Sequence, residues 1–185
     1  MKILYIHGFG SYYDPAKSKV QTLQSLGDVV GVNVDYCEGF EVSVQKVKDA
    51  AMSCDLIVGT SMGGFMASHV GAAFGIPFVA LNPAINPSES LKKYVGAFVD
   101  YGGNHKVLDE AVVAHYPAIK TVGGCGLVLL EADDDVIDPN ETLAALDDVY
   151  DVRMIEGGSH RFDSLPAQLS EIQDFFDGAG MVYGL

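Results

Sequence analysis

Short runs of consecutive apolar residues alternate along the chain with longer stretches in which apolar residues recur every three or four positions. The short runs predict buried strands and the longer stretches predict helices with one apolar face. We expect strands at residues 2–6, 29–36, 55–60, 76–81, 126–130 and 151–155, and helices at about 15–25, 41–52, 62–74, 139–149 and 166–176. Strands that are apolar throughout and alternate with helices are typical of a parallel sheet. The pattern therefore predicts an α/β fold with a mostly parallel sheet and helices on both faces.

Two Asp-Pro pairs lie where helices are expected to begin. Asp14-Pro15 and Asp138-Pro139 each combine a residue that caps helices with a proline suited to the first helical position. We therefore expect Asp14 and Asp138 to be helix caps.

The segment from about residue 83 to residue 124 departs from this alternation. It separates the fourth expected strand from the fifth and shows helical periodicity at about 90–98 and 108–115. Ligands of a parallel sheet bind at the carboxyl ends of its strands, where a connection of this length lies. We expect a single domain over residues 1–185, with a short helical insertion at about 83–124 that covers the site. An ordinary pair of connecting helices is the alternative.

The composition is that of a compact globular protein, because 49% of the 185 residues are hydrophobic and 19% are charged. A formal net charge of −14 disfavours binding to nucleic acids and to anionic membranes, and favours cationic or neutral ligands. No apolar stretch reaches the roughly 18 residues of a membrane helix, and residues 1–6 are too few for a secretory signal. The three cysteines are odd in number and lack metal-ligand spacing. These features predict a cytoplasmic protein without a metal site, and they carry no signal for its oligomeric state.

The segment Gly59-Thr60-Ser61-Met62-Gly63 is a G-x-S-x-G motif. An expected strand precedes it and an expected helix follows it, so Ser61 lies on a strand-to-helix turn. A nucleophilic serine needs this turn, because strained backbone angles expose its hydroxyl and glycines allow neighbouring chain to pass closely. The start of the helix also presents free N–H groups to a developing oxyanion. The motif predicts Ser61 as a nucleophile, whereas the alternative is a glycine-rich turn with a surface serine.

A serine hydroxyl needs an adjacent base to react at neutral pH, and five histidines could supply one. His160 follows the last expected strand and thus lies at the edge of the sheet that carries Ser61. His69 is two turns into the serine's helix and is expected to point away from the hydroxyl. His105 and His115 belong to the insertion, where an exposed role is commoner. We therefore predict His160 as the general base.

The acid candidates are Asp133, Asp134 and Asp135, on the loop after the 126–130 strand. The resulting order along the chain, Ser, Asp, His, is the order of α/β hydrolases. The spacing does not choose among the three aspartates, and the two that are not used should face solvent.

The loop after the first strand, His7-Gly8-Phe9-Gly10, is the candidate for the remaining part of the site. A tetrahedral oxyanion needs two converging N–H donors. We expect these to be the backbone N–H groups of Met62 and Phe9. A glycine turn with a structural histidine is the alternative. The candidates for the substrate pocket are His7, Tyr94, Phe98 and Tyr101.

The chain resembles the YqiA/YcfP-type group of small bacterial esterases in the α/β-hydrolase superfamily. The resemblance extends over nearly the whole chain as an order of four motifs. These are Ile6-His7-Gly8-Phe9, Gly59-Thr60-Ser61-Met62-Gly63-Gly64, Leu81-Asn82-Pro83-Ala84 and Glu156-Gly157-Gly158-Ser159-His160-Arg161-Phe162. The Asn-Pro-Ala element is the most specific of them, because the others recur in many hydrolases.

The resemblance implies roles for individual residues. It makes Ser61 the nucleophile and His160 the base, and it selects Asp134 as the acid, since residues 129–138 resemble the group's strand-end segment ending Gly-Asp-Glu-x-x-Asp. This chain departs from that segment in having Asp133 where the group usually has glycine. The implied activity is hydrolysis of small carboxylic or thio esters through an acyl-enzyme on Ser61, without metal or organic cofactor. A thioesterase, acyltransferase or amidase with the same triad, or a non-catalytic binding protein of the same fold, are the alternatives.

Overall fold

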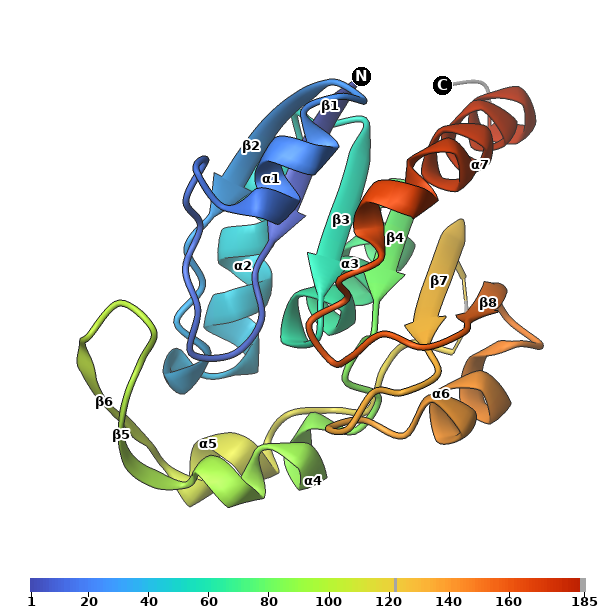
Figure 1. Cartoon of the computed structure of the whole chain (residues 1–185). Helices are drawn as coiled ribbons and strands as arrows, with labels where there is room; N and C mark the ends of the chain where they lie inside the picture. Colours follow the sequence, from blue (N-terminus) through green and yellow to red (C-terminus); the bar gives the residue numbers. More distant parts are fainter. Residues whose placement is uncertain (122, 184–185) are drawn as a thin grey trace.

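The computed structural model describes residues 1–121 and 123–183 and is built on a six-stranded sheet (Figure 1). Its strands are β1 (Lys2–Ile6), β2 (Asp28–Val32), β3 (Leu56–Thr60), β4 (Phe78–Leu81), β7 (Gly126–Glu131) and β8 (Asp151–Ile155). They lie in the order β2-β1-β3-β4-β7-β8, and each neighbouring pair is parallel. Their carboxyl ends therefore meet at one edge. The predicted α/β class with a parallel sheet is confirmed.

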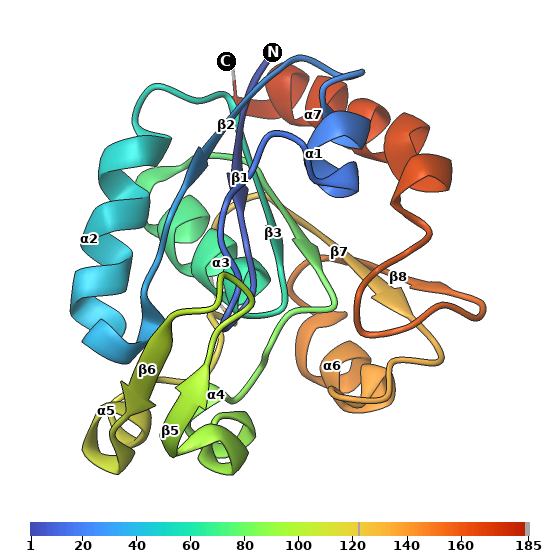
Figure 2. The same cartoon turned by 60° about the vertical axis from the view of Figure 1, so that its left-hand side comes forward.

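Helices cover both faces of this sheet (Figure 2). One face carries α1 (Ser18–Leu23), the short 3-10 helix η3 (Leu165–Gln168) and α7 (Leu169–Tyr183). The other carries α2 (Phe40–Ala51), α3 (Met62–Phe74) and α6 (Pro139–Leu146), with the 3-10 helix η1 (Tyr36–Glu38) before α2. Side chains alternate along each strand, so that Ile3 and Tyr5 of β1 enter one core while Leu4 and Ile6 enter the other.

Of the two Asp-Pro pairs that were expected to begin helices, one does so. Asp138 caps α6 as expected, because its carboxylate accepts the N–H of Asn140 and Pro139 is the first helical residue. The expectation for Asp14 is wrong. Asp14 closes a turn by accepting the N–H of Ala16, and α1 begins four residues later at Ser18.

The insertion at 83–124 is only partly helical, which corrects the expectation of a helical insertion, and its residue 122 lies outside the described residues. It contains α4 (Pro87–Ser90), the 3-10 helix η2 (Lys92–Tyr94), an antiparallel hairpin of β5 (Gly96–Val99) and β6 (His105–Leu108), and α5 (Glu110–Ala114). Residues 96–98, expected to be helical, instead pair with residues 106–108 across the hairpin, and periodicity within a single segment does not reveal such a pairing. Figure 1 shows these elements beyond the carboxyl ends of β1, β3 and β4.

His69, which was expected to point away from the Ser61 hydroxyl, is a residue of the hydrophobic core. His69 lies inside the core, with its ring centroid 4.5 Å from that of Phe65 and 5.1 Å from that of Phe40. Burial lowers the pKa of His69 to about 4, so the ring is neutral and acts as a packing residue.

Among the described residues, no helix combines the length and the apolar character needed to cross a membrane.

Candidate active site

Ser61 occupies the sharp turn between β3 and α3. Its backbone angles are φ 56° and ψ −118°, a conformation that L-residues rarely adopt. The turn is closed by close backbone approaches: a side-chain carbon on Gly63 would lie 2.1 Å from the Ile6 carbonyl oxygen, and one on Gly59 would lie 2.1 Å from the Gly63 carbonyl oxygen. Glycine is therefore required at both positions, and the motif holds the serine hydroxyl above the carboxyl end of the sheet.

His160 reaches Ser61 from the loop that follows β8. Its Nε2 lies 2.9 Å from Ser61 Oγ, although the two residues are 99 positions apart in the chain. The imidazole is 20% exposed and borders the space above the serine. This distance lies within the range over which a general base can take a hydroxyl proton.

Asp134 completes the arrangement on the other side of the imidazole. Its Oδ2 and Oδ1 lie 2.8 and 3.0 Å from His160 Nδ1, and the side chain is only 2% exposed. Burial alone would raise the pKa of Asp134, but hydrogen bonds from His160 and from the N–H groups of Ile137 and Val136 lower it below its ordinary value. The carboxylate is therefore ionised and fixes the imidazole with a proton on Nδ1 and a lone pair on Nε2.

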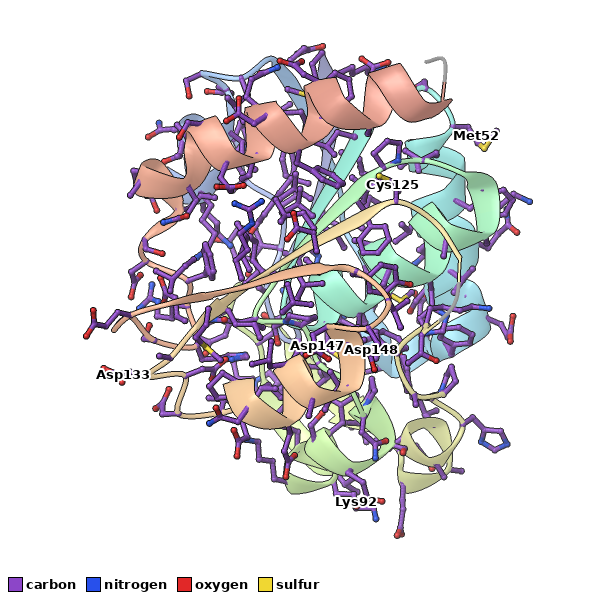
Figure 3. All side chains as sticks on the ribbon, turned by 90° about the vertical axis from the view of Figure 1, so that its right-hand side faces the viewer. Met52, Lys92, Cys125, Asp133, Asp147 and Asp148 are labelled. Carbon is purple, nitrogen blue, oxygen red and sulfur yellow. The ribbon has the colours of Figure 1, made fainter. Side chains whose placement is uncertain are left out.

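The two neighbouring aspartates lie away from the imidazole. Asp133 is exposed and stands at the outer edge of the molecule, pointing away from its body (Figure 3). Asp135 is also exposed. Of the three carboxylates that the sequence left open, the structure brings Asp134 to His160. In the part of the chain that the structure describes, no group of three or more His, Cys, Asp or Glu is placed to hold a metal ion.

The loop after β1 lies against the serine. A side-chain carbon on Gly8 would lie 3.4 Å from Ser61 Cβ and 3.9 Å from Ser61 Oγ. Phe9 and Met62 both line the space above Ser61. No hydrogen bond within the described residues uses the backbone N–H of either one. Both donors are therefore available to an oxyanion.

His7 does not line the space above Ser61, in contrast to its expected place in the substrate pocket. It is 2% exposed, its Nδ1–H donates to the Gly8 carbonyl oxygen at 2.8 Å, and its Nε2 accepts the N–H of Val34 at 3.1 Å. Burial lowers its pKa, so the ring is neutral at neutral pH. Its two backbone partners anchor the loop that carries Phe9, and it borders a smaller neighbouring cavity of about 290 Å³.

A cavity of about 750 Å³ opens above the serine, within the usual size range of small-molecule sites. Three of the expected pocket residues line it, namely Tyr94, Phe98 and Tyr101. The ring of Phe9 lies between this insertion and the core, with centroids 5.1 Å from Tyr94 and 5.2 Å from Phe98. The Tyr101 N–H also donates to the Gly10 carbonyl oxygen at 2.8 Å. The insertion thus forms one wall of the cavity and is joined to the loop after β1.

The charge of the cavity is opposite to the net charge of the chain. Four of the eleven Lys and Arg residues line it, while one of the 25 Asp and Glu residues, Asp100, is among the described lining residues. Asp100 accepts hydrogen bonds from the N–H groups of Gly102 and Asn104 and is thus occupied by its own turn. The preference for cationic or neutral ligands that the net charge suggested is therefore not reflected in the cavity.

Glu131, at the end of β7, belongs to the site although no sequence motif predicted it. Its carboxylate is fully buried and accepts three backbone N–H groups of the histidine loop, from Ser159 at 2.6 Å, Ser164 at 2.7 Å and Asp163 at 3.3 Å. A glutamate ending an otherwise apolar strand was the available signal. Its effect is to fix the loop that carries His160.

Asn82 supports the same loop from the end of β4. Its Nδ2 donates to the Ser159 carbonyl oxygen at 2.9 Å, and its Oδ1 accepts the N–H of Glu131 at 2.8 Å. The residue is buried and has a positive φ of 43°. The Asn-Pro-Ala element that distinguished the sequence therefore joins two strand ends to the histidine loop.

Glu131→Gln is expected to displace this loop. A glutamine amide has one oxygen, so its NH₂ group would face at least one of the three N–H donors and leave it unsatisfied, at a cost of about 1–3 kcal/mol in the free energy of unfolding. We expect kcat on an ester to fall at least about tenfold through misplacement of His160, with KM changed little. Kinetics and urea denaturation would measure both effects. Glu156→Gln, an exposed neighbour, is the control, and equal effects of the two changes would contradict this role.

Comparison with known sequences places the chain in a family. Residues 2–177 match the uncharacterised protein family UPF0227. The chain belongs to UPF0227. A UPF0227 protein of Vibrio atlanticus (strain LGP32) is 29% identical to it over 182 residues, covering 94% of this chain and 98% of the relative. A UPF0227 protein of Shewanella sp. (strain MR-4) is 24% identical over 182 residues, with the same coverage of 94% and 98%.

Solved α/β hydrolases share the fold of this UPF0227 protein. Est1E from Butyrivibrio proteoclasticus matches with a TM-score of 0.72 and 17% identity, over 96% of this chain and 87% of Est1E. Mouse alpha/beta hydrolase domain-containing protein 10 matches with a TM-score of 0.67 and 18% identity, over 96% and 90% of the two chains. These likenesses confirm the α/β-hydrolase fold, and with the family match they confirm the resemblance to the YqiA/YcfP-type group.

Proposed function

We propose that this UPF0227 protein is a serine hydrolase that cleaves small carboxylic or thio esters through an acyl-enzyme on Ser61. The observation that carries the proposal is the unbroken series of hydrogen bonds from Ser61 Oγ to His160 Nε2 and from His160 Nδ1 to Asp134, on a strained strand-to-helix turn. A histidine placed only for packing would not need its two ring nitrogens shared between a serine hydroxyl and a buried carboxylate.

The geometry supports a two-step acyl transfer. Ser61 Oγ attacks the carbonyl carbon of the ester while its proton passes to His160 Nε2, and the C=O electron pair moves onto the oxygen. Asp134 stabilises the imidazolium that forms. Collapse of the tetrahedral intermediate breaks the bond to the alcohol, which takes the proton from His160. Water then attacks the acyl-enzyme by the same route, and the acid leaves.

The backbone N–H groups of Met62 and Phe9 are our candidates for binding the oxyanion. Met62 is the first residue of α3, where an N–H group has no partner within the helix and the helix dipole favours negative charge. Phe9 lies in the turn closed by the hydrogen bond from the Ser11 N–H to the Gly8 carbonyl oxygen, which leaves its own N–H free.

Proteins that share this fold support an ester as the substrate. A structure of Est1E with bound ferulic acid matches with a TM-score of 0.68, and a match with a TM-score of 0.67 comes from work on the lipolytic enzymes LipS and LipT. We extend ester hydrolysis to this chain because its own side chains supply a nucleophile, a base and an acid.

Fluorophosphonate labelling would test the proposal directly, because an activated serine reacts with this reagent much faster than an ordinary one. We expect the intact protein to be labelled on Ser61 and the denatured protein to remain unlabelled. Hydrolysis of matched p-nitrophenyl ester, thioester and anilide substrates would then define the bond that is cleaved. Equal, slow labelling of intact and denatured protein would show that Ser61 is not activated and would favour a binding protein.

A further inference from the structure

One wall of the catalytic cavity is formed by three basic side chains. Lys17 and Lys19 come from the start of α1, and Arg161 follows His160 directly in the chain. We call these three residues the basic wall. Their segments are packed together, because Val20 of α1 shares one apolar cluster with Phe162 and Leu165 of the histidine loop (Figure 2). The fold thus brings cations from opposite ends of the chain to one side of Ser61.

No residue of the basic wall forms a salt bridge within the described residues, although carboxylates lie near enough to Lys17 and Lys19 to raise their pKa values. Four other basic residues, Lys46, Lys92, Lys106 and Arg153, form salt bridges elsewhere, and the remaining lysines form none in the described part of the chain. Lys17 donates to the Tyr12 carbonyl oxygen at 2.8 Å and to Ser11 Oγ at 3.1 Å, so its head group is held in place. The side-chain ammonium group of Lys19 makes no hydrogen bond in the described part of the chain. Carboxylates outnumber cations by 25 to 11 in this protein, so the gathering of these cations at one cavity is the feature that requires an explanation.

The environment of Lys19 disfavours its charged form mainly through burial. Burial lowers the pKa of Lys19, and the positive charges of Arg161 and Lys17 also lower it, while the carboxylates of Asp163 and Glu131 raise it. A cavity wall with one sign of charge raises the local concentration of ligands of the opposite sign.

A purely structural role for Lys19, as a counter-charge to these carboxylates, is the main alternative. Glu131 already accepts three backbone N–H groups, and Asp163 accepts the Ser159 hydroxyl. Neither carboxylate forms a salt bridge with Lys19 within the described residues. The buried carboxylate of Glu131 is therefore satisfied without the lysine, and the exposed carboxylate of Asp163 is open to solvent.

We propose that Lys17, Lys19 and Arg161 form an anion-binding subsite, and that the preferred substrate is an ester carrying a carboxylate or phosphate group. The apolar part of such a substrate would contact apolar side chains that line the same cavity, which include Phe98, Val99 and Ile137. This inference rests on the proposed function, since the ester would be cleaved at Ser61. It assigns the substrate class by the local charge of the cavity, which is opposite in sign to the net charge of the chain.

Matched pairs of substrates would test the subsite. For a charge on the acyl side, mono-p-nitrophenyl suberate is compared with p-nitrophenyl octanoate. For a charge on the alcohol side, 3-carboxy-4-nitrophenyl butyrate is compared with 4-nitrophenyl butyrate. We expect kcat/KM to favour the anionic member of at least one pair, and we expect this preference to shrink as ionic strength rises from about 0.05 to 0.5 M.

Substitutions distinguish binding of the substrate anion at this subsite from a general effect of the protein's net charge. Lys19→Met keeps the length of the side chain and should lower kcat/KM for the preferred anionic substrate about tenfold, with less than about a twofold change for its neutral partner. Arg161→Gln should act in the same direction. Lys48→Met is the control, because it changes the net charge equally from α2, on the other face of the sheet, where Lys48 lies over the Phe74 ring. Unfolding midpoints would verify that each variant is folded.

The possible results distinguish this inference from the proposed function. Hydrolysis of both members of each pair with the same response to Lys19→Met would reject the subsite and leave the hydrolase intact. If no ester is hydrolysed, the proposed function fails, and calorimetry on Ser61→Ala protein still tests the subsite with octyl phosphate, octanoate and octanol. Tighter binding of octyl phosphate or octanoate than of octanol, lost in Ser61→Ala/Lys19→Met, supports it. Equal binding of all three overturns it.

Discussion

Replacing Ser61 by alanine is expected to abolish ester hydrolysis while leaving the protein folded. The change removes the atom that forms the acyl-enzyme, and loss of such a nucleophile lowers kcat by on the order of 10⁶. The hydroxyl makes its hydrogen bond to His160 on the rim of the cavity, not in the core, so the free energy of unfolding should change by less than about 1 kcal/mol. Steady-state kinetics on p-nitrophenyl butyrate and urea denaturation measure the two quantities.

Ser68→Ala is the matched control, because it removes a hydroxyl from α3, the helix that begins directly after Ser61. Ser68 Oγ donates to the Phe65 carbonyl oxygen and does not line the cavity. Its loss should cost some stability and leave kcat within a few-fold of wild type. Retention of activity by Ser61→Ala within a few-fold would reject Ser61 as the nucleophile, whatever the effect of Ser68→Ala.

The second large effect is expected from Asp134→Asn. The asparagine oxygen can still accept the N–H groups of Val136 and Ile137, so the loop should keep its shape. The NH₂ group would then face His160 Nδ1 and stabilise the tautomer with a proton on Nε2. That tautomer cannot accept the proton of Ser61 Oγ, so kcat should fall by on the order of 10⁴.

Asp133→Asn and Asp135→Asn are the controls for this prediction, because each removes the same charge from the same loop. Both side chains are exposed, so each change should lower kcat less than about tenfold at ordinary salt. The unfolding midpoint would be recorded for each variant. A collapse of kcat in Asp133→Asn or Asp135→Asn, with near-normal turnover in Asp134→Asn, would overturn the assignment of the acid and leave Ser61 and His160 in place.

The local pattern of apolar, polar and glycine residues was sufficient to predict the elements whose structure depends on residues nearby in the chain. Apolar runs and helical periodicity located the six strands of the sheet, and helix α3 spans 62–74 as expected. The G-x-S-x-G motif located the strained turn, because its geometry depends on glycines within two residues of Ser61. The order of strands and loops placed His160 at the same edge as Ser61, since carboxyl ends of parallel strands share an edge.

Contacts between distant segments were decided only by the tertiary structure. Asp133, Asp134 and Asp135 are chemically identical, and the turn of the loop after β7 determines which one meets His160. The hairpin of β5 and β6 depends on pairing across a turn, and the support of the histidine loop by Glu131 joins residues 28 to 33 positions apart. The basic wall joins the start of α1 to Arg161. Local sequence determines backbone preference and burial, whereas these contacts arise only when separate elements pack on one sheet. The sequence by itself therefore determined the fold and the strained turn that carries Ser61, and packing decided which side chains surround that turn.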